Sequence, residues 1–309
     1  AEGVLAFDLR PADGGVWPEF SAGAHIDLHL RAGKVRSYSL VNPPGQTHRY
    51  VVAVHLDANG RGGSRHLHQV ARAGDLIKIA GPRNTFGLRE EAPHSVLIAG
   101  GIGVTPLWNM AQRLEQLGAP WTLHYCARSR EAAAYVADLE QLAAATGGAL
   151  HLHFDGGDPQ RRADLSAIVG SSPAGAHLYC CGPAAMLRAF DAATSILDPA
   201  CVHREFFAAP AAPAGASPAA QDAFTLKLAR SCRKLAVGAD QTVLEAVLAA
   251  GVDVPYSCMS GICRACETRV LDGRPDHRDM VLDAAEQSRG DTMIICCSRA
   301  LSAELTLDL

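Results

Sequence analysis

The chain has 309 residues, enough for about two or three domains, and 48% of them are apolar. Its formal net charge is −4 and it has no basic run, so the composition excludes a typical nucleic-acid-binding protein. No apolar stretch is as long as a membrane span, and no charged-then-apolar leader is present. We therefore expect a cytoplasmic protein with no nucleic-acid or membrane partner.

The chain begins at Ala1, and an apparent strand follows almost at once. This start predicts trimming, or excision from a longer chain. Ten cysteines are present, and several lie in apolar, strand-like runs such as "HLYCC". Secreted disulfide frameworks are typical of small, loop-rich domains, so we expect reduced thiols in this larger chain.

Residues 1–91 contain short alternating apolar runs separated by turn residues, which is the pattern of a small antiparallel β-barrel. In "RSYSL", Arg36 can meet a phosphate and Tyr38 can pack on a planar ring, although an ordinary strand is the simpler interpretation of these residues alone. The loop "GRGGS" at 60–64 is rich in N–H donors and suits a terminal phosphate; a hairpin turn is an equal alternative.

Residues 92–207 alternate between strand-like and helical segments, which predicts a parallel sheet with crossover helices. The helices are expected at 105–118, 131–146 and 183–195. The segment "GGIGVTP" follows the first strand, and "CGP" ends a later strand. Ligands bind at the carboxyl ends of such strands, so the two segments predict a nucleotide site, with tight turns that hold no ligand as the alternative.

Residues 208–222, "AAPAAPAGASPAAQD", read as a semi-rigid linker because they are rich in Ala and Pro and lack any period. The segment 223–309 follows as a separate domain. It contains a predicted hairpin, a strand at 267–271 and a final strand near the C-terminus. A helix is expected at 242–250, a short helix at 281–287 and a strand at 293–296.

The loop "SCMSGICRAC" holds Cys258, Cys263 and Cys266 in a C-x4-C-x2-C pattern, and Cys296 follows later. This four-cysteine spacing is typical of plant-type ligation of a [2Fe–2S] cluster, which transfers single electrons. Zinc sites usually have paired short spacings, and a disulfide leaves two of the four cysteines unexplained. Cys297 is the other candidate for the fourth ligand, but in a strand it would face away from Cys296.

The motifs "RSYS", "GRGGS", "GGIGVTP", "CGP", "EFF" and the cysteine set occur in one order along the chain. In this order the chain resembles the phthalate dioxygenase reductase family, which includes vanillate O-demethylase reductases and the reductase part of some self-sufficient cytochromes P450. The resemblance implies a flavin-binding antiparallel β-barrel, a parallel-sheet nucleotide domain and a C-terminal β-grasp ferredoxin. It also implies FMN, NADH and a [2Fe–2S] cluster as cofactors.

The resemblance also implies roles for individual residues. Those that would touch the flavin or its phosphate are Arg36, Tyr38, Ser39, Gly62, Gly63 and Ser64. Those that would line the nicotinamide nucleotide path are Gly101, Thr105, Cys181, Gly182 and Pro183. Phe207, or its neighbour Phe206, would lie against the flavin ring, which makes Phe207 and Ser39 the expected catalytic residues.

Two departures from the family pattern stand in the ferredoxin part. Arg264 and Ala265 replace the usual Gly-Thr inside the cysteine loop, so we expect a change in the exposure, potential or docking of the cluster. Cys297 stands where an apolar residue is usual, and we expect it to be a packing residue. The remaining thiols, Cys126, Cys180, Cys201 and Cys232, are expected to be small buried hydrophobes.

The predicted function is electron transfer from NADH through FMN and the cluster to an oxygenase, either a Rieske non-haem iron protein or a P450 haem domain, as a separate subunit or a fused domain. The segment Arg128-Ser129-Arg130 follows the second strand of the nucleotide domain and offers cationic side chains to a 2′-phosphate. Asp155, at the end of the next strand, disfavours it, and the family favours NADH. One alternative is a cysteine- or zinc-based redox-sensing interaction protein. Another is a stand-alone oxidase with no protein acceptor.

Overall fold

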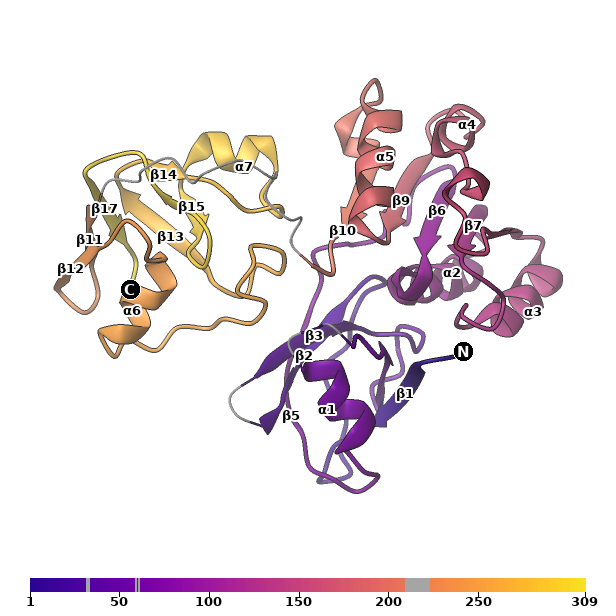
Figure 1. Ribbon diagram of the computed structural model, residues 1–309, viewed down its shortest axis with the longest axis horizontal. Coiled ribbons are helices and arrows are strands. Elements are labelled where there is room, and N and C mark those ends of the chain that lie inside the picture. The colour runs from indigo at the N-terminus through magenta and orange to yellow at the C-terminus, as the bar shows by residue number, and fades with distance from the viewer. Residues whose placement is uncertain (32–33, 59, 61, 209–222) are drawn as a thin grey trace. The chain divides into compact units, whose positions relative to one another are not determined.

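The computed structural model describes residues 1–31, 34–58, 60, 62–208 and 223–309 (Figure 1). The chain divides into two compact units, Ala1–Phe207 and Ala208–Leu309. Beyond Ala208, the expected linker lies outside the described residues. Among the described residues, no helix combines the length and apolarity needed to cross a bilayer.

The first lobe of unit 1 is an antiparallel β structure. Its elements are β1 (Val4–Leu9), β2 (His25–His29), β3 (Val35–Ser39), β4 (Tyr50–His55), α1 (Gly63–Gln69) and β5 (Lys78–Arg83). The strands form the sheets β3-β2-β5 and β1-β4, and an isolated bridge between Leu40 and Val52 connects them. Ile26, Leu40 and Val52 are buried in one apolar core that holds the two sheets together. The predicted antiparallel domain is confirmed, although its described strands do not close into one continuous barrel ladder.

The helix α1 was not expected. It begins at Gly63, inside the segment interpreted from sequence as a phosphate loop or a hairpin turn. Gly62 precedes it with φ of 83°, a left-handed conformation that glycine adopts without steric cost. Leu67 is buried in the same core, so burial of one apolar side chain fixes a helix whose sequence is otherwise polar.

The second lobe of unit 1 is a five-stranded parallel sheet in the order β10-β9-β6-β7-β8. Its strands are β6 (Ser95–Gly100), β7 (Trp121–Ala127), β8 (Ala149–Phe154), β9 (His177–Cys181) and β10 (Val202–Glu205). Its helices are α2 (Val104–Leu117), α3 (Val136–Thr146), α4 (Leu165–Gly170) and α5 (Ala184–Thr194). Side chains of α2 and α3 pack in the core on one face of the sheet, and α4 and α5 lie together on the other side (Figure 1). The helix expected from residue 131 begins only at Val136, because Tyr135 has φ of 61° and interrupts the helical backbone.

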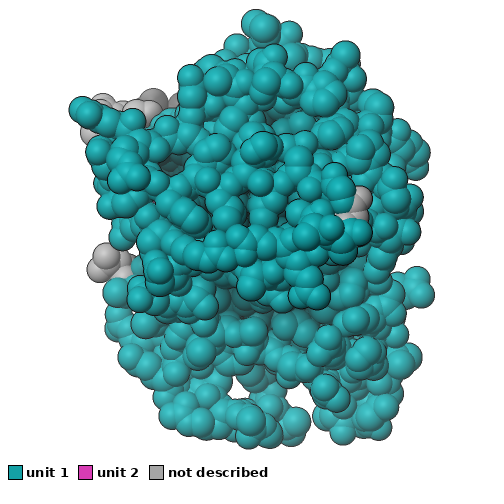
Figure 2. All heavy atoms as spheres, turned by 90° about the vertical axis from the view of Figure 1, so that its right-hand side faces the viewer, with its two compact units in different colours: residues 1–207 teal, residues 208–309 magenta. Residues whose placement is uncertain are grey.

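The helix α2 joins the two lobes of unit 1. Asn109 is fully buried; its side-chain oxygen accepts a hydrogen bond from the Gly23 N–H at 3.1 Å, and its amide donates to the Asn42 carbonyl. Gln112 donates to the Val41 carbonyl at 2.8 Å. Unit 1 is shown in Figure 2 with all its heavy atoms. These contacts hold the ends of β6 and β9 in a fixed relation to the antiparallel lobe.

Unit 2 is a mixed sheet in the order β12-β11-β17-β13-β15, with a short β14-β16 pair. Its strands are β11 (Phe224–Leu228), β12 (Arg233–Val237), β13 (Glu267–Asp272), β14 (Pro275–Asp276), β15 (Thr292–Ile294), β16 (Arg299–Ala300) and β17 (Glu304–Leu307). The helix α6 (Val243–Ala249) buries Val243, Leu244 and Val247 against this sheet. The second helix, α7 (Ala284–Arg289), starts three residues later than the 281 expected from sequence, because Asp283 and Glu286 form a capping box that sets its first turn.

We predict that Asn109→Ala destabilises unit 1 by about 1–3 kcal/mol, because it leaves the buried Gly23 N–H without a partner. All three tryptophans, Trp17, Trp108 and Trp121, lie in unit 1, so chemical denaturation followed by tryptophan fluorescence measures this effect. The control is Gln112→Ala, which removes a half-buried side chain from the same helix and should cost less. Equal stability of N109A and the parent protein would contradict the joining role of Asn109.

Candidate functional site

Four cysteines of unit 2 come together from two segments far apart in the sequence. Cys258, Cys263 and Cys266 lie in the loop between α6 and β13, and Cys296 lies in the turn that follows β15. Hydrogen-bonding contacts connect Cys258 with Cys263 and Cys296, and connect Cys266 with Cys296. These sulfur contacts raise the pKa of the Cys263 and Cys266 thiols and lower that of Cys296.

The strand expected at 293–296 ends at Ile294. The argument that Cys296 and Cys297 face opposite sides of a strand is therefore wrong, because both lie in a turn. What separates them is their contacts. Cys296 is buried and contacts Cys258 and Cys266, whereas the Cys297 thiol packs half-buried near the Ile294 carbonyl, 3.7 Å away.

The backbone of the cysteine loop is irregular in the way a small cluster requires. Met259, Gly261 and Arg264 have positive φ values of 53°, 74° and 55°. Backbone N–H groups point at the sulfurs; the N–H of Ser260, for example, donates to Cys258 Sγ at 3.4 Å. N–H groups directed at thiolates stabilise the negative charge that a bound cluster places there.

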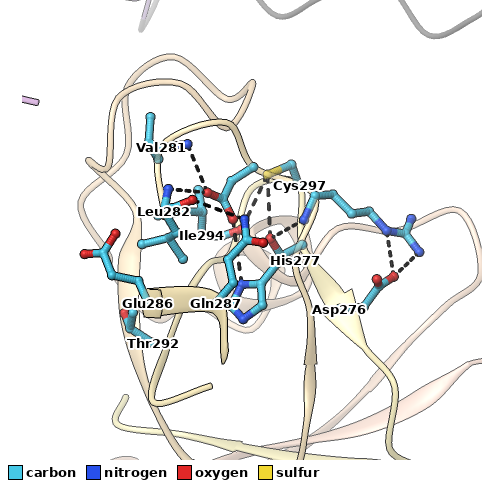
Figure 3. Close-up of polar contacts among 12 residues, drawn as sticks. Asp276, His277, Val281, Leu282, Glu286, Gln287, Thr292, Ile294 and Cys297 are labelled. Carbon is cyan, nitrogen blue, oxygen red and sulfur yellow. Dashed lines mark hydrogen bonds and ion pairs between the residues drawn. The ribbon is translucent and has the colours of Figure 1, made fainter. Parts of the chain in front are cut away.

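Gly261 sits where the loop meets a neighbouring segment. A Cβ at this position would lie 2.7 Å from Cys297 Sγ and 3.2 Å from the Asp279 Cα. The Asp279 carboxylate accepts hydrogen bonds from the N–H groups of Val281 and Leu282, and this segment lies beside Cys297 (Figure 3). The loop can therefore reach its observed position only without a side chain at residue 261.

The four thiols fit a [2Fe–2S] cluster, whose ligands are spread over two irons. Within the described ranges, no set of three or more His, Cys, Asp or Glu side chains is arranged to hold a single metal ion. All ten cysteines lie in those ranges and none forms a disulfide. The four sulfurs come from two segments, and four cysteine thiolates are the usual ligands of a two-iron cluster.

The antiparallel lobe brings together residues expected at the flavin. Tyr38 and Ser39 end β3, and Arg36 lies two residues earlier on the same strand. Ser39 is buried, and its hydroxyl has no hydrogen-bond partner among the described residues. His25, which sequence reasoning missed, pairs with Ser39 across β2 and β3, and neither of its ring nitrogens has a partner in the described part of the chain. Burial, reinforced by the Arg83 charge, lowers the His25 pKa to about 4.

The "GRGGS" segment lies against two cations. A Cβ on Gly63 would come within 2.7 Å of Arg36 Cγ, and a Cβ on Gly62 would come within 3.2 Å of Lys34 Nζ. The Ser64 hydroxyl accepts a hydrogen bond from the Asp57 N–H at 3.1 Å. Two glycines beside Arg36 and Lys34 form a cradle that a phosphate can enter and that larger side chains would fill.

The two glycine-bearing strand ends of the parallel sheet touch each other. β6 and β9 are neighbours, and a Cβ on Gly103 would lie 2.2 Å from the Cys181 carbonyl oxygen. Gly182 is less tightly enclosed, because its Cβ would lie 2.7 Å from Met186 Sδ and 3.1 Å from the Gly100 Cα. The structure therefore confirms the sequence argument that "GGIG" and "CGP" share one edge of the sheet.

The other residues expected near the nucleotide differ in exposure. Gly101 has φ of 54° with open space around it, and Pro183 immediately precedes α5. Thr105 is buried, and its hydroxyl donates to the Ile102 carbonyl at 2.9 Å. Phe207 is 45% exposed whereas Phe206 is 8% exposed, so only Phe207 is free to lie on a ligand.

A buried carboxyl at this edge was missed by sequence reasoning. Glu205 ends β10 next to Cys181, whose thiol donates to Glu205 Oε2 at 3.9 Å. Burial raises the pKa of Glu205 to about 8 and raises that of Cys181 well above its usual range. Both groups are thus neutral at pH 7. The only sequence signal was an acidic residue directly before two phenylalanines in "EFF".

Outside these sites, the remaining thiols only partly follow the expectation of burial. Cys180 is buried, Cys126 and Cys201 are half-buried, and Cys232 is exposed. Cys232 has φ of 54°, which places it in the tight connection between β11 and β12. The prediction of a buried hydrophobe is wrong for Cys232.

Comparisons with known proteins match the parallel-sheet lobe and the cysteine-bearing unit to two protein families. Residues 97–192 match the family described as "Oxidoreductase NAD-binding domain", and residues 226–301 match "2Fe-2S iron-sulfur cluster binding domain". The chain is 55% identical to the phenoxybenzoate dioxygenase subunit beta of Ectopseudomonas oleovorans, over 100% of this chain and 94% of that protein.

Several solved structures match the whole chain. Phthalate dioxygenase reductase is 36% identical, with a TM-score of 0.70 over 94% of its length. A type IV self-sufficient cytochrome P450 monooxygenase is 38% identical, with a TM-score of 0.89, and this chain spans 39% of it. The fold and the sites define an NADH-dependent flavin iron–sulfur oxidoreductase with FMN and a [2Fe–2S] cluster. The chain belongs to the phthalate dioxygenase reductase family.

We predict that Gly261→Ala lowers the iron and sulfide content per polypeptide several-fold, because its Cβ would press on Cys297 Sγ and the Asp279 backbone. The matched control is Gly251→Ala: Gly251 has φ of 73°, close to the 74° of Gly261, but its Cβ would meet no atom within 4 Å. Cluster content is measured by iron and sulfide assay and by visible absorption. Equal cluster loss in both variants would assign the effect to backbone strain and not to crowding.

Proposed function

We propose that this chain is the reductase component of an oxygenase system and supplies electrons to a separate or fused oxygenase. The observation that carries the proposal is the convergence of four thiols in a ferredoxin unit, which the same chain joins to a nucleotide-binding lobe. We divide the chain functionally into 1–91 for FMN, 92–207 for NADH, 208–222 as linker and 223–309 for the cluster.

When bound, FMN and the [2Fe–2S] cluster would supply the redox chemistry, namely hydride acceptance from NADH at the flavin and single-electron transfer at the cluster. The chain's own residues hold and orient these groups. We assign the cluster to Cys258, Cys263, Cys266 and Cys296. Lys34 and Arg36 offset the charge of the FMN phosphate beside Gly62 and Gly63, and Ser64 adds a hydroxyl.

Tyr38 and Ser39 orient the flavin ring in this proposal. Burial raises the Tyr38 pKa to about 12, so its ring packs as a neutral phenol. The unpartnered Ser39 hydroxyl supplies a hydrogen bond to the ring edge. Phe207 covers the ring where the nicotinamide would enter, since its exposed side chain is available for that contact.

The nicotinamide nucleotide runs along Gly101, Thr105, Cys181, Gly182 and Pro183. The crowded glycines at this edge allow the backbone to approach a pyrophosphate closely. Glu205 keeps its proton at pH 7, so no negative charge opposes the nucleotide there.

We propose that the acceptor is a Rieske-type dioxygenase acting on an aromatic carboxylate, as the name of the phenoxybenzoate dioxygenase relative suggests. A P450 haem domain is the second candidate, because the whole of this chain matches part of a P450 structure.

To test the proposal, purified reductase would be mixed with NADH and with each oxygenase, and reduction of the acceptor would be followed spectroscopically. Rapid NADH oxidation without reduction of either acceptor would reject the oxygenase assignment and favour a stand-alone oxidase. A protein that binds zinc but no FMN would favour the redox-sensing alternative.

We predict that Cys296→Ser removes the visible and EPR spectra of the [2Fe–2S] cluster or strongly alters them, while Cys297→Ser retains a parent-like spectrum. The reason is that Cys296 contacts Cys258 and Cys266, whereas Cys297 packs against the Gly261 backbone. The spectra are recorded on anaerobically reconstituted protein. A normal cluster in C296S with loss in C297S would assign the fourth ligand to Cys297.

We predict that Arg128→Ala changes kcat/KM for NADH and NADPH to a similar extent. Arg128 directly follows β7, and Asp155 directly follows the neighbouring strand β8, so the Asp155 carboxylate disfavours a 2′-phosphate at this edge. Steady-state kinetics with both nucleotides measures the effect. A large loss confined to NADPH would show that Arg128 recognises the 2′-phosphate and would reverse the predicted preference.

A further inference from the structure

Arg264 lies inside the cysteine loop, between the proposed ligands Cys263 and Cys266. Its φ of 55° falls in the left-handed region that normally favours glycine. An arginine at such a position is costly unless its side chain makes compensating contacts. Its side chain is only 26% exposed, so it folds back on the unit instead of extending into solvent.

The Arg264 guanidinium makes a two-pronged contact with the Glu286 carboxylate, with Nη1 lying 3.0 Å from Oε1 and Nη2 contacting Oε2. Nη2 also donates to the Val281 carbonyl at 2.7 Å. A weaker contact of 3.4 Å joins the guanidinium to Glu267 at the start of β13. One side chain thus ties the cluster loop to three separate positions.

Glu286 is itself fixed by the start of α7. It forms the capping box with Asp283, whose N–H donates to Glu286 Oε2 at 2.8 Å. Val281 and Leu282 lie in the segment that leads into α7, and Glu286 lies close to them in the first turn of that helix (Figure 3). Arg264 therefore connects the loop to an element whose own backbone is already held in place.

Without the Arg264 guanidinium, negative charge would be in excess around this part of the loop. Glu286 and Glu267 contact the guanidinium directly, and Asp279 and Arg289 are the further charged groups facing this pair. The guanidinium lowers the Glu286 pKa, so that carboxyl is ionised at pH 7. Adding an electron to a cluster beside uncompensated carboxylates is unfavourable, whereas a nearby cation favours it.

We propose that Arg264 is a positioning residue that fastens the cluster loop to α7, and that its charge offsets Glu286 and Glu267 so that the cluster is retained longer and reduced at a higher potential. This inference rests on the proposed cluster ligands. Arg264 acts through the loop and through the local charge, without direct contact to the nucleotide or the acceptor.

The test uses the full chain with its cluster and FMN. The reduction potential of the cluster is measured by EPR-monitored titration. Release of the cluster is measured as the loss of visible absorbance in the presence of an iron chelator. In Arg264→Gly, glycine accepts the left-handed backbone, so only the guanidinium contacts are lost. We expect several-fold faster release and a lower potential. Arg264→Lys keeps the charge without the two-pronged contact, and should restore most of the potential but only part of the retention.

The Glu286→Gln variant changes the local charge in the opposite direction to Arg264→Gly. Glutamine preserves the capping box while removing a negative charge, so the potential should rise above that of the parent. The matched control, Arg230→Gln, breaks a two-pronged contact with Asp308 elsewhere on unit 2 and should alter neither quantity.

If Arg264 has a purely structural role, the reduction potentials of R264G and E286Q should shift in the same direction or not at all. Either result would overturn the proposal. If R264G loses its cluster during purification, R264K and E286Q decide the question, and an unchanged potential in E286Q overturns it. A parent protein without a [2Fe–2S] EPR signal would instead refute the ligand assignment, so the two failures are distinguishable.

Discussion

The structure of the ferredoxin unit depends on bringing four thiols from two distant segments into contact. The cysteine loop supplies three of them, and the turn after β15 supplies Cys296. Gly261 allows the loop to pass Cys297 and the Asp279 backbone, and no other residue fits there without displacement. The sheet and α6 supply the buried core that holds both segments in register, so the metal site and the fold share one set of constraints.

In unit 1, buried polar contacts hold two lobes in a fixed relation. Asn109 and Gln112 reach from α2 to the carbonyls and N–H groups of the antiparallel lobe. The helix that carries them begins directly after the glycine turn of β6. The glycine-bearing edge of the parallel sheet and the antiparallel lobe are thus held in relation to each other by two polar side chains of one helix.

Much of the architecture was predictable because its patterns are local. Alternation indicated β2, β3, β4 and β11, strand–helix alternation indicated the parallel sheet, and cysteine spacing indicated the cluster. The errors have specific causes. The helix α1 depends on burial of Leu67, and α7 starts where its capping box dictates. The strand β15 ends at Ile294, two residues before Cys296, and a run of apolar residues does not reveal this end.

The sequence by itself determined the fold class, the order of the domains, the chemical nature of the cluster ligands and the glycine turns, because each follows from residue type at short spacing. Only the tertiary structure decided which groups meet: His25 with Ser39, Cys181 with Glu205, and Arg264 with Glu286. These pairs join residues from different segments, and their burial sets which of the groups carry charge. Such contacts depend on how the segments pack, and short-range sequence patterns contain no information about them.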